Sequence, residues 1–198
     1  MKLPIQIENK ASYECMKIAE TSQVLARLAA EDWEKRHHSY TGFLFLAFAI
    51  EAMFIFHRKQ VEPQYDKSIK CRRSEFHKET LRLCSIPLNI RCGRDYQTIE
   101  KCLKIRDSIA HGDFFVTSRD HFPPDGVSDD DIVTGILDLP AEQFKAIKYD
   151  DLVKGIEAAK QIDECISDQG YPAHQNGYRA ESRTHLTLAF GVSGISTW

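Results

Sequence analysis

The chain has 198 residues, of which 42% are hydrophobic and 28% charged, and its formal net charge is −3. This is the composition of an ordinary soluble globular protein, so we expect a single domain over residues 1–198 with its core at 11–166. The six cysteines contain no Cys-x-x-Cys pair, which argues against a zinc site and a disulfide framework. No apolar run follows the start of the sequence, so we expect no signal peptide and a cytoplasmic protein.

Charge is distributed unevenly along the chain. Residues 67–106 carry eleven Lys or Arg against four acidic residues, a net of +7, whereas residues 107–198 carry seven against sixteen, a net of −9. The middle segment is therefore a candidate surface for a polyanion such as RNA, although a run of charge can equally be a solvated face.

Residues 11–36 carry apolar side chains at helical spacing, which predicts a long amphipathic helix. The predicted apolar stripe contains Cys15, Ile18, Ala19, Leu25, Leu28, Ala29 and Trp33. His37, His38 and Ser39 interrupt the pattern, and we interpret them as a helix connector in which Ser39 caps the next helix. Two adjacent histidines without a second cluster at ligand spacing do not predict a metal site.

Residues 43–56 form the most hydrophobic segment, in which Glu51 is the one charged residue. The segment is shorter than the about 20 apolar residues that a membrane span needs, so we predict a buried core helix and no membrane association. A helix that is apolar on all sides must be covered on all sides, and we expect part of that cover from the second subunit of a homodimer.

Glu51 needs a cationic partner in such a helix, because a lone buried carboxylate is unfavourable. We predict that it approaches Arg106, within one subunit or between two. The alternative is that Glu51 faces water and pairs locally with Arg58 or Lys59.

A polar and basic stretch continues to residue 73, with Pro63 in a loop, and a shorter helix is predicted from about Ser74 to Leu83. Basic residues here and in the next helix are candidate phosphate contacts, for which charge matters more than base-edge geometry. These residues are Arg72, Arg73, Lys78, Arg82, Arg91, Arg94 and Lys104.

The next predicted helix, residues 95–111, places its apolar side chains within an arc of about 140°. Arg106 lies in the middle of that arc, where a guanidinium needs an anionic partner or a cleft. Asp107 and His111 lie four residues apart at the rim of the same face, and Gly112 is suited to end the helix. Alternatively, Arg106 extends over the core to an exposed acid and His111 only satisfies the helix end.

After Gly112 the pattern changes to short apolar segments at 114–117 and 131–139, which predict strands or extended arms. The acidic run at 129–131 lacks alternating ligand spacing, so we predict an exposed turn and no metal. Residues 149–166 predict another helix, with an apolar side formed by Leu152, Ile156, Ala159, Ile162 and Ile166. Residues 168–198 form a polar C-terminal segment, in which the stretch from Leu186 to Val192 either pairs as an edge strand or remains mobile.

The segment 106–112 resembles the signature of HEPN domains. Four positions separate Arg106 from His111, the first of them is a polar residue, and Gly112 follows the histidine. The resemblance extends over residues 11–111 and the helix near 150–166. It implies a mainly α fold, an antiparallel bundle of four to five helices with short extended or β segments after the motif helix. Many HEPN domains are metal-independent endoribonucleases that act at a homodimer interface, so the resemblance also implies RNA as substrate.

Cleavage of RNA by its own 2′-hydroxyl needs a base, an acid and positive charge beside the phosphorane. Histidine can serve as base or acid near neutral pH, and arginine matches phosphate oxygens. The resemblance assigns Arg106 and His111 as the catalytic pair and Asp107 as the polar residue that follows the arginine. Because Asp107 lies one turn before His111, we expect it to fix the His111 tautomer and raise its pKa. Glu51 and Ser108 are predicted supporting residues. It implies no metal or cofactor, and products with 2′,3′-cyclic phosphate and 5′-hydroxyl ends.

The resemblance further suggests a bacterial toxin or phage-defence component, with an antitoxin or a nucleotidyltransferase-type partner. In one HEPN branch such a partner modifies a tyrosine two residues beyond the histidine. This chain has Asp113 at that position, so it departs from that form of regulation and leaves a different antitoxin open.

Two other functions stay open at the level of the sequence. One is a non-catalytic HEPN-like module that binds RNA or a nucleotide for a partner protein, which RNA binding without cleavage would indicate. The other is a helical dimerisation or scaffold protein, in which Arg106 and His111 are structural and Arg106→Ala loses stability and not activity.

Overall fold

A computed structural model describes residues 5–7, 10–66, 71–87, 93–110, 144, 147–191 and 195–197 of the chain. Within these ranges the protein is mainly helical, which confirms the predicted fold class at this level. The α-helices are α1 (Ala11–Leu28), α2 (Asp32–Val61), α3 (Arg73–Leu83), α4 (Gly93–Ala110) and α7 (Tyr149–Gln169). The predicted segments at 114–117 and 131–139 lie outside the described residues.

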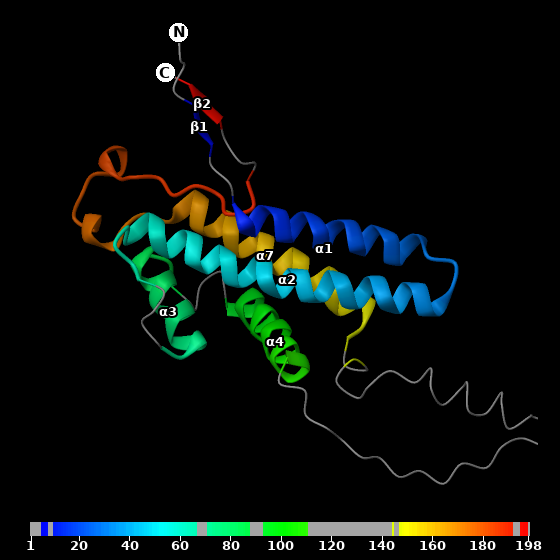
Figure 1. Ribbon diagram of the computed structural model, residues 1–198. Coiled ribbons are helices and arrows are strands. Elements are labelled where there is room, and N and C mark those ends of the chain that lie inside the picture. Colours follow the sequence, from blue (N-terminus) through cyan, green and yellow to red (C-terminus); the bar gives the residue numbers. More distant parts are fainter. Residues whose placement is uncertain are drawn as a thin grey trace, which may run out of the picture.

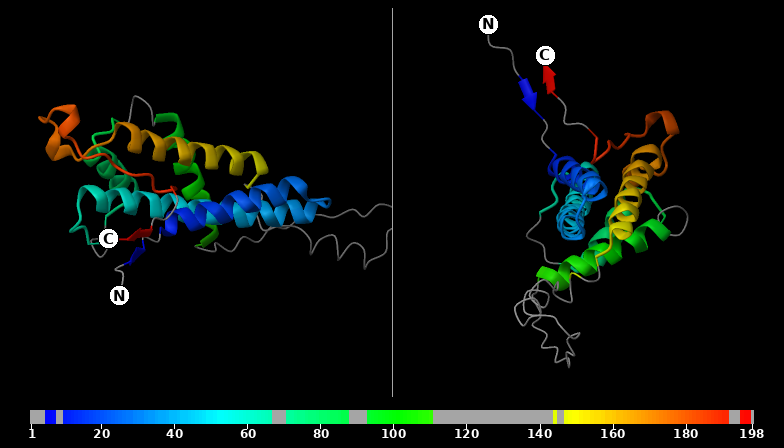
Figure 2. Two further views of the ribbon diagram at one scale, coloured as in Figure 1. Left: turned by 90° about the horizontal axis from the view of Figure 1, so that it is seen from above. Right: turned by 90° about the vertical axis from the view of Figure 1, so that its right-hand side faces the viewer.

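The helices α1, α2 and α7 lie side by side, and α3 and α4 cover one side of this group (Figures 1 and 2). Helices α1 and α2 form an antiparallel hairpin. Helix α4 packs against both α7 and α2, and α3 packs against the C-terminal half of α2. This arrangement brings α3 and α4, the helices that carry most of the candidate site, to the same side of the central helix α2.

The connection between the first two helices differs from the prediction. Helix α1 ends at Leu28, and α2 begins at Asp32 and continues without interruption through His37, His38 and Ser39. Ser39 is buried inside α2 and its hydroxyl donates a hydrogen bond to the Lys35 carbonyl at 2.7 Å, so it does not cap a helix. The true connector at 29–31 contains no Gly or Pro, which is why its sequence gives no turn signal.

Of the stripe predicted for α1, Ala19 is buried, but the side that faces the core is otherwise formed by residues outside the stripe, most of them small. Its buried residues are Ser12, Met16, Ala19, Ser22 and Ala26. By contrast, Ile18, Leu25 and Leu28 of the predicted stripe are 39%, 43% and 71% exposed. The physical reason is close helix packing at Gly42 of α2, where an added Cβ would lie 3.1 Å from the Ser22 Cβ and 2.8 Å from Leu152 Cδ2.

Helix α2 is the central core helix, as the sequence predicted. Phe43, Leu46, Ile50, Met53 and Phe54 are fully buried. Of the helices in the described ranges, α2 is the one long and apolar enough to cross a membrane by length and composition, and half of its most apolar stretch is buried inside the protein. A buried core helix meets the same criterion.

Helix α7 presents the predicted apolar side to the core, since Leu152, Ile156, Ala159, Ile162 and Ile166 are all buried. It can approach its neighbours closely because position 155 is glycine: an added Cβ would lie 2.6 Å from Leu46 Cδ2 and 2.9 Å from Cys102 Sγ. The same face also carries a buried acid, Asp163, which the periodicity did not predict.

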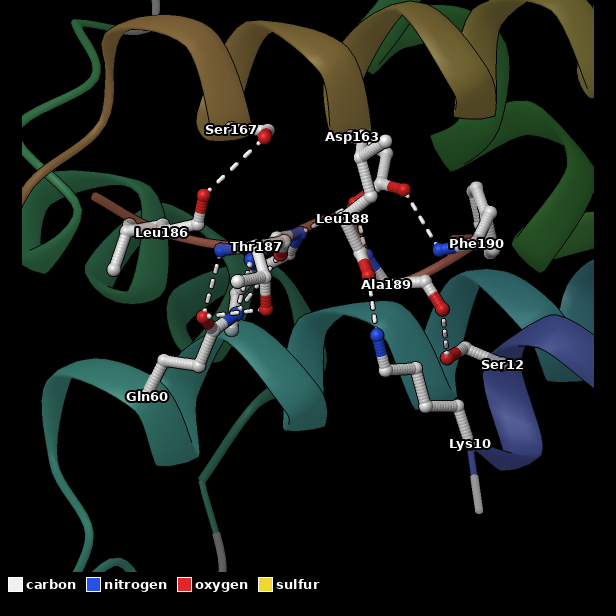
Figure 3. Close-up of polar contacts among 11 residues, drawn as sticks. Lys10, Ser12, Gln60, Asp163, Ser167, Leu186, Thr187, Leu188, Ala189 and Phe190 are labelled. Carbon is white, nitrogen blue, oxygen red and sulfur yellow. Dashed lines mark hydrogen bonds and ion pairs between the residues drawn. The ribbon is translucent and has the colours of Figure 1, made fainter. Parts of the chain in front are cut away.

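Asp163 fixes the chain beyond α7 (Figure 3). Its two carboxylate oxygens accept hydrogen bonds from the backbone amides of Ala189 and Phe190, each at 2.8 Å. Oδ1 also lies 2.7 Å from Nε2 of His57 in α2, and the side chains of His57 and Asp163 are 0% and 2% exposed. We call His57, Asp163 and the segment Leu186–Phe190 the C-terminal clasp.

Further polar side chains hold the clasp along its length (Figure 3). The Gln60 amide oxygen accepts from the Thr187 amide at 2.8 Å, and the Ser12 hydroxyl donates to the Ala189 carbonyl at 2.7 Å. Lys10 and Ser167 donate to the carbonyls of Leu188 and Leu186. The described part of the stretch predicted as an edge strand or a mobile segment, 186–191, is therefore held by side chains, and Leu186 and Ala189 belong to the core.

Two short strands lie at the chain termini. Strand β1 (Ile5–Ile7) pairs with β2 (Ile195–Thr197) in antiparallel register, with Ile5 opposite Thr197. The two strands therefore lie together beyond the ends of α1 and the clasp (Figure 1).

Candidate functional site

Helix α4 positions Arg106 at the edge of the core. Tyr96, Ile99, Cys102 and Leu103 of this helix are buried, and Arg106 follows Leu103 by three residues, on the same side. The Arg106 guanidinium donates from Nη2 to Oε1 of Glu51 in α2. The predicted pairing of Glu51 with Arg106 is thus confirmed, within one chain, whereas Arg58 pairs with Glu62 and not with Glu51.

A second arginine, Arg73 at the start of α3, completes the arrangement. It donates from Nη1 and Nη2 to the two carboxylate oxygens of Asp107, at 2.8 and 2.5 Å. Arg73 Nη1 also lies 3.7 Å from Glu51 Oε1, and Arg106 Nη1 lies 3.3 Å from Asp107 Oδ1. We call these four side chains the charge cluster.

The charge cluster joins three helices that are far apart in the sequence, and its two cations balance its two anions. The hydrogen bonds to Asp107 raise the pKa of the Arg73 guanidinium above its usual value. Arg73 was expected only as a phosphate contact, and no spacing rule connects it to Asp107, 34 positions away. The expected contact between Asp107 and His111 lies outside the described residues, as does His111 itself.

The charge cluster is partly open to solvent. The side chain of Arg106 is 18% exposed, and those of Arg73, Asp107 and Glu51 are 29%, 32% and 33% exposed. Nε of Arg106 is buried and has no hydrogen-bond partner among the described residues. On the open side, the Arg106 guanidinium lies 5.8 Å from the ring centre of Phe48, a residue that is 44% exposed.

A pocket of about 220 Å³ lies between α3 and α4, directly beside the charge cluster. We call it the α3–α4 pocket. It is lined by Arg73, Ser74, His77, Tyr96, Glu100, Leu103 and Lys104. Arg73 therefore belongs to both the pocket and the charge cluster, and it forms the wall between them.

The inner end of the α3–α4 pocket is neutral. Burial, with a smaller effect of Arg73, lowers the pKa of His77 to about 3, so its imidazole carries no charge at neutral pH. The His77 ring stacks on Phe54 with ring centres 3.9 Å apart. Burial raises the pKa of Tyr96 to about 12, and its hydroxyl has no hydrogen-bond partner in the described part of the chain.

The other predicted site residues are distributed over different surfaces. Lys104 lines the α3–α4 pocket, whereas Lys78 and Arg82 line a separate hollow on another face of α3, together with Glu75 and Glu79. Arg82 is bound by Glu79 through hydrogen bonds of 2.7 and 2.6 Å. Arg72, Arg94 and Ser108 are exposed, and the Ser108 hydroxyl donates to the Ile105 carbonyl. Arg91 lies outside the described residues.

Sequence reasoning named Arg73 and Lys104 of the pocket wall as site residues and missed the other five lining residues, among them Tyr96 and Glu100. Tyr96 was assigned to the apolar arc, since its ring follows the core periodicity, and Glu100 has no motif around it. The signal that could have identified them is their spacing: Tyr96, Glu100 and Leu103 lie four and three residues apart, on one side of the helix.

The thiols and acids of the described ranges show no arrangement for a metal. No group of three or more His, Cys, Asp or Glu side chains comes together there. The described cysteines, at positions 15, 71, 84, 102 and 165, are free thiols, and burial raises the pKa values of Cys84 and Cys102 to about 12. These two thiols are therefore protonated packing residues at neutral pH.

Comparison with known proteins found no matching family model, no matching curated protein and no matching solved structure. The chemistry of the site must therefore be inferred from its own geometry. That geometry consists of two guanidiniums ordered by two carboxylates, a partly open aromatic ring, and an adjoining pocket with a neutral inner end.

Proposed function

We propose that this protein is a HEPN-like, metal-independent endoribonuclease whose site forms at a homodimer interface. The observation that carries the proposal is the anchoring of Arg106. Its guanidinium sits at the edge of the core, is oriented by Glu51 and Asp107, and remains 18% exposed five residues before His111. A cation held in this way is positioned for a phosphate group and does not need to be ordered when the substrate binds.

The roles of the individual groups follow from what each can donate or accept. Arginine has five N–H donors, and Glu51 and Asp107 engage only part of them, so others are free for phosphate oxygens. Glu51 is assigned as a positioning residue, because it contacts Arg106 and acts through it. His111 takes the proton of the 2′-hydroxyl or supplies one to the departing 5′-oxygen.

The homodimer supplies the second half of the chemistry. One chain has a single Arg106 and a single His111, whereas cleavage by 2′-hydroxyl attack needs both a base and an acid. A two-fold pairing of the α4 ends doubles both groups. Phe48, exposed beside Arg106, gives the open side of the charge cluster an apolar contact that suits a second copy of the chain.

The test is incubation of purified protein with mixed cellular RNA in excess chelator, followed by analysis of the new RNA ends. Wild type should leave 2′,3′-cyclic phosphate and 5′-hydroxyl ends. His111→Ala and Arg106→Ala should each lose at least about 100-fold in rate. His174→Ala, in the exposed 3₁₀ helix η1 (Ala173–Gln175), is the matched control and should cleave like wild type.

Undiminished cleavage by His111→Ala would refute the proposal. Size-exclusion chromatography with light scattering tests the dimer separately, and a monomer at concentrations where cleavage is observed would refute the shared site. The toxin or phage-defence role and the antitoxin partner remain predictions of the HEPN resemblance, and the cytoplasmic location remains a prediction from the sequence of the N-terminal segment.

A second candidate function follows from the same ion pairs. Because Glu51 and Asp107 neutralise Arg106 and Arg73, the charge cluster also suits a non-catalytic module in which Arg106 joins α4 to α2. In that case the wild-type protein leaves RNA intact, and Arg106→Ala lowers the free energy of unfolding without changing RNA binding.

A further inference from the structure

The α3–α4 pocket has the features of a ligand site that no side chain of the described protein fills. Its volume of about 220 Å³ is below the about 300–1,000 Å³ of pockets for drug-sized ligands, so it suits a flat ring system such as a nucleobase and not a whole nucleotide. At its wall, the Tyr96 hydroxyl is buried without a partner among the described residues, and the residue is 5% exposed. Buried phenols nearly always form a hydrogen bond, which points to a ligand atom as the missing partner.

The charged groups of the pocket have opposite signs. Glu100 supplies a carboxylate, while Arg73 and Lys104 supply cations. Lys104 Nζ lies 3.9 Å from Glu100 Oε2, beyond hydrogen-bond distance, so this carboxylate keeps acceptor capacity for a ligand. Arg73 has N–H groups beyond the two that bind Asp107.

We propose that the α3–α4 pocket binds a guanine base, and, on the basis of the proposed ribonuclease function, that it holds a guanine of the RNA next to the cleavage site. Guanine carries two adjacent donors, N1–H and the N2 amine, which match the two oxygens of the Glu100 carboxylate. Its O6 and N7 are the acceptors that arginine and lysine side chains recognise most often. An extruded base of single-stranded RNA is read in this way, through its hydrogen-bonding edges beside aromatic side chains.

Other ligands fit the same walls less well. A phosphate group would face the Glu100 carboxylate, and Asp107 already neutralises the charge of the Arg73 guanidinium that an anion would need, whereas the neutral acceptors of a base need only its remaining N–H groups. Adenine would present its N1 acceptor to the same carboxylate, next to its single amine. The neutral His77 and Tyr96 side chains at the inner end also suit an uncharged ring better than an anion.

Arg73 couples the pocket to the charge cluster. It lines the pocket, binds Asp107 and lies 3.7 Å from Glu51, and both of these acids contact Arg106. A base in the pocket is thus one side chain away from the arginine that is proposed to hold the phosphate. The pocket would thereby select cleavage beside guanine.

The experiment is a ligand-observed NMR titration of the full-length protein with guanosine, adenosine and inorganic phosphate. Wild type should bind guanosine at least about tenfold more tightly than adenosine, and inorganic phosphate should not compete with guanosine. Glu100→Gln, which keeps the shape but replaces an acceptor by a donor, should weaken guanosine binding at least about tenfold. Tyr96→Phe should weaken it by a smaller factor.

The matched control is Glu157→Gln, an exposed glutamate on α7, which should bind guanosine like wild type. Thermal unfolding midpoints equal to wild type would show that Glu100→Gln is folded. Equal affinities for guanosine and adenosine would overturn the proposal. So would binding of inorganic phosphate alone, or unchanged guanosine affinity in both Glu100→Gln and Tyr96→Phe.

The nucleosides contain no phosphodiester, so this titration does not depend on catalysis. Guanosine binding by a protein that leaves RNA intact would retain the pocket assignment and reject the nuclease. Cleavage of RNA without guanosine binding, and without preference for sites beside guanine, would retain the nuclease and reject the pocket assignment.

Discussion

Helix α2 contributes Glu51 to the charge cluster and His57, six residues later, to the C-terminal clasp, and the two networks differ in how many of their polar groups are hydrogen-bonded. At Glu51 the charge cluster leaves its four side chains between 18% and 33% exposed. At His57 the C-terminal clasp buries a carboxylate, an imidazole and two backbone amides, with the side chains of His57 and Asp163 at 0% and 2% exposure. The charge cluster is therefore an open network, partly accessible to solvent, and the C-terminal clasp is a closed network, shielded from it.

This difference in exposure and hydrogen bonding distinguishes a candidate functional site from a network that only stabilises the fold. In the clasp, hydrogen bonds from His57 and two backbone amides engage both oxygens of Asp163, so little capacity is left for a ligand. In the charge cluster and the pocket beside it, Arg106 Nε and the Tyr96 hydroxyl lack partners among the described residues. Unsatisfied polar groups next to solvent-accessible charges are where binding and catalysis are expected.

The largest expected effect tests the closed network. Asp163→Ala leaves two buried amides and His57 without their acceptor and should lower the free energy of unfolding by about 3–5 kcal/mol. Urea denaturation followed by circular dichroism measures this loss. Asp168→Ala, an exposed acid on the same helix, should change stability by less than about 0.5 kcal/mol. Similar losses in the two variants would remove the distinction between the networks.

The second prediction concerns the pH dependence that His77, in the wall of the α3–α4 pocket, gives to the free energy of unfolding. Its pKa is lowered to about 3 in the folded protein, so the unfolded chain binds this proton near pH 6.5 while the folded chain does not. The stability it contributes is present above about pH 6.5 and is lost as the pH falls toward 3, by about 1.4 kcal/mol per pH unit.

The measurement compares His77→Phe with wild type by urea denaturation between neutral pH and about pH 5. Whatever the substitution costs at neutral pH, the stability of the variant should fall less steeply with acidification, by the equivalent of one proton. His174→Ala, in which an exposed histidine is replaced, should keep the wild-type slope. An unchanged slope in His77→Phe would contradict a neutral, buried His77.

The third prediction tests the open network. Glu51→Ala removes one acid from the charge cluster but leaves Arg106 and Arg73 in contact with Asp107, so the free energy of unfolding should fall by only about 1 kcal/mol. Chemical denaturation checks this, with the exposed Glu157→Ala as control. A loss as large as that of Asp163→Ala would show that the cluster is mainly structural and would favour the second candidate function.

The smallest expected effect concerns the outer edge of the clasp. Gln60→Ala removes the hydrogen bonds to Thr187, which lie near the surface, and should cost about 0.5–1 kcal/mol. It should also speed proteolysis of the C-terminal segment, because local opening becomes easier there. Gln169→Ala, an exposed glutamine at the end of α7, should match wild type in both measurements.

Periodicity predicted the helices α3, α4 and α7 well, and it failed where small residues replace large ones. In α1, Ile18, Leu25 and Leu28 are at helical spacing but exposed, whereas Ser22 and Ala26 join the predicted Ala19 on the core side because Gly42 brings α2 close. Similarly, the break between α1 and α2 is set by the packing of the hairpin, and its sequence contains neither Gly nor Pro. A hydropathy pattern measures only apolarity, whereas the fit between two helices depends on side-chain volume.

The sequence by itself determined the mainly helical class, the central position of α2 and the partnership of Glu51 with Arg106, because a single acid in an apolar helix and a single cation in an apolar arc each require a partner. Only the tertiary structure decided that Arg73 joins them, that a pocket opens between α3 and α4, and that Asp163 binds the backbone amides of Ala189 and Phe190. Arg73 and Asp107 are 34 residues apart in the sequence, and Asp163 and Ala189 are 26 residues apart. Their partners are selected by the three-dimensional packing of the helices, which local spacing does not encode.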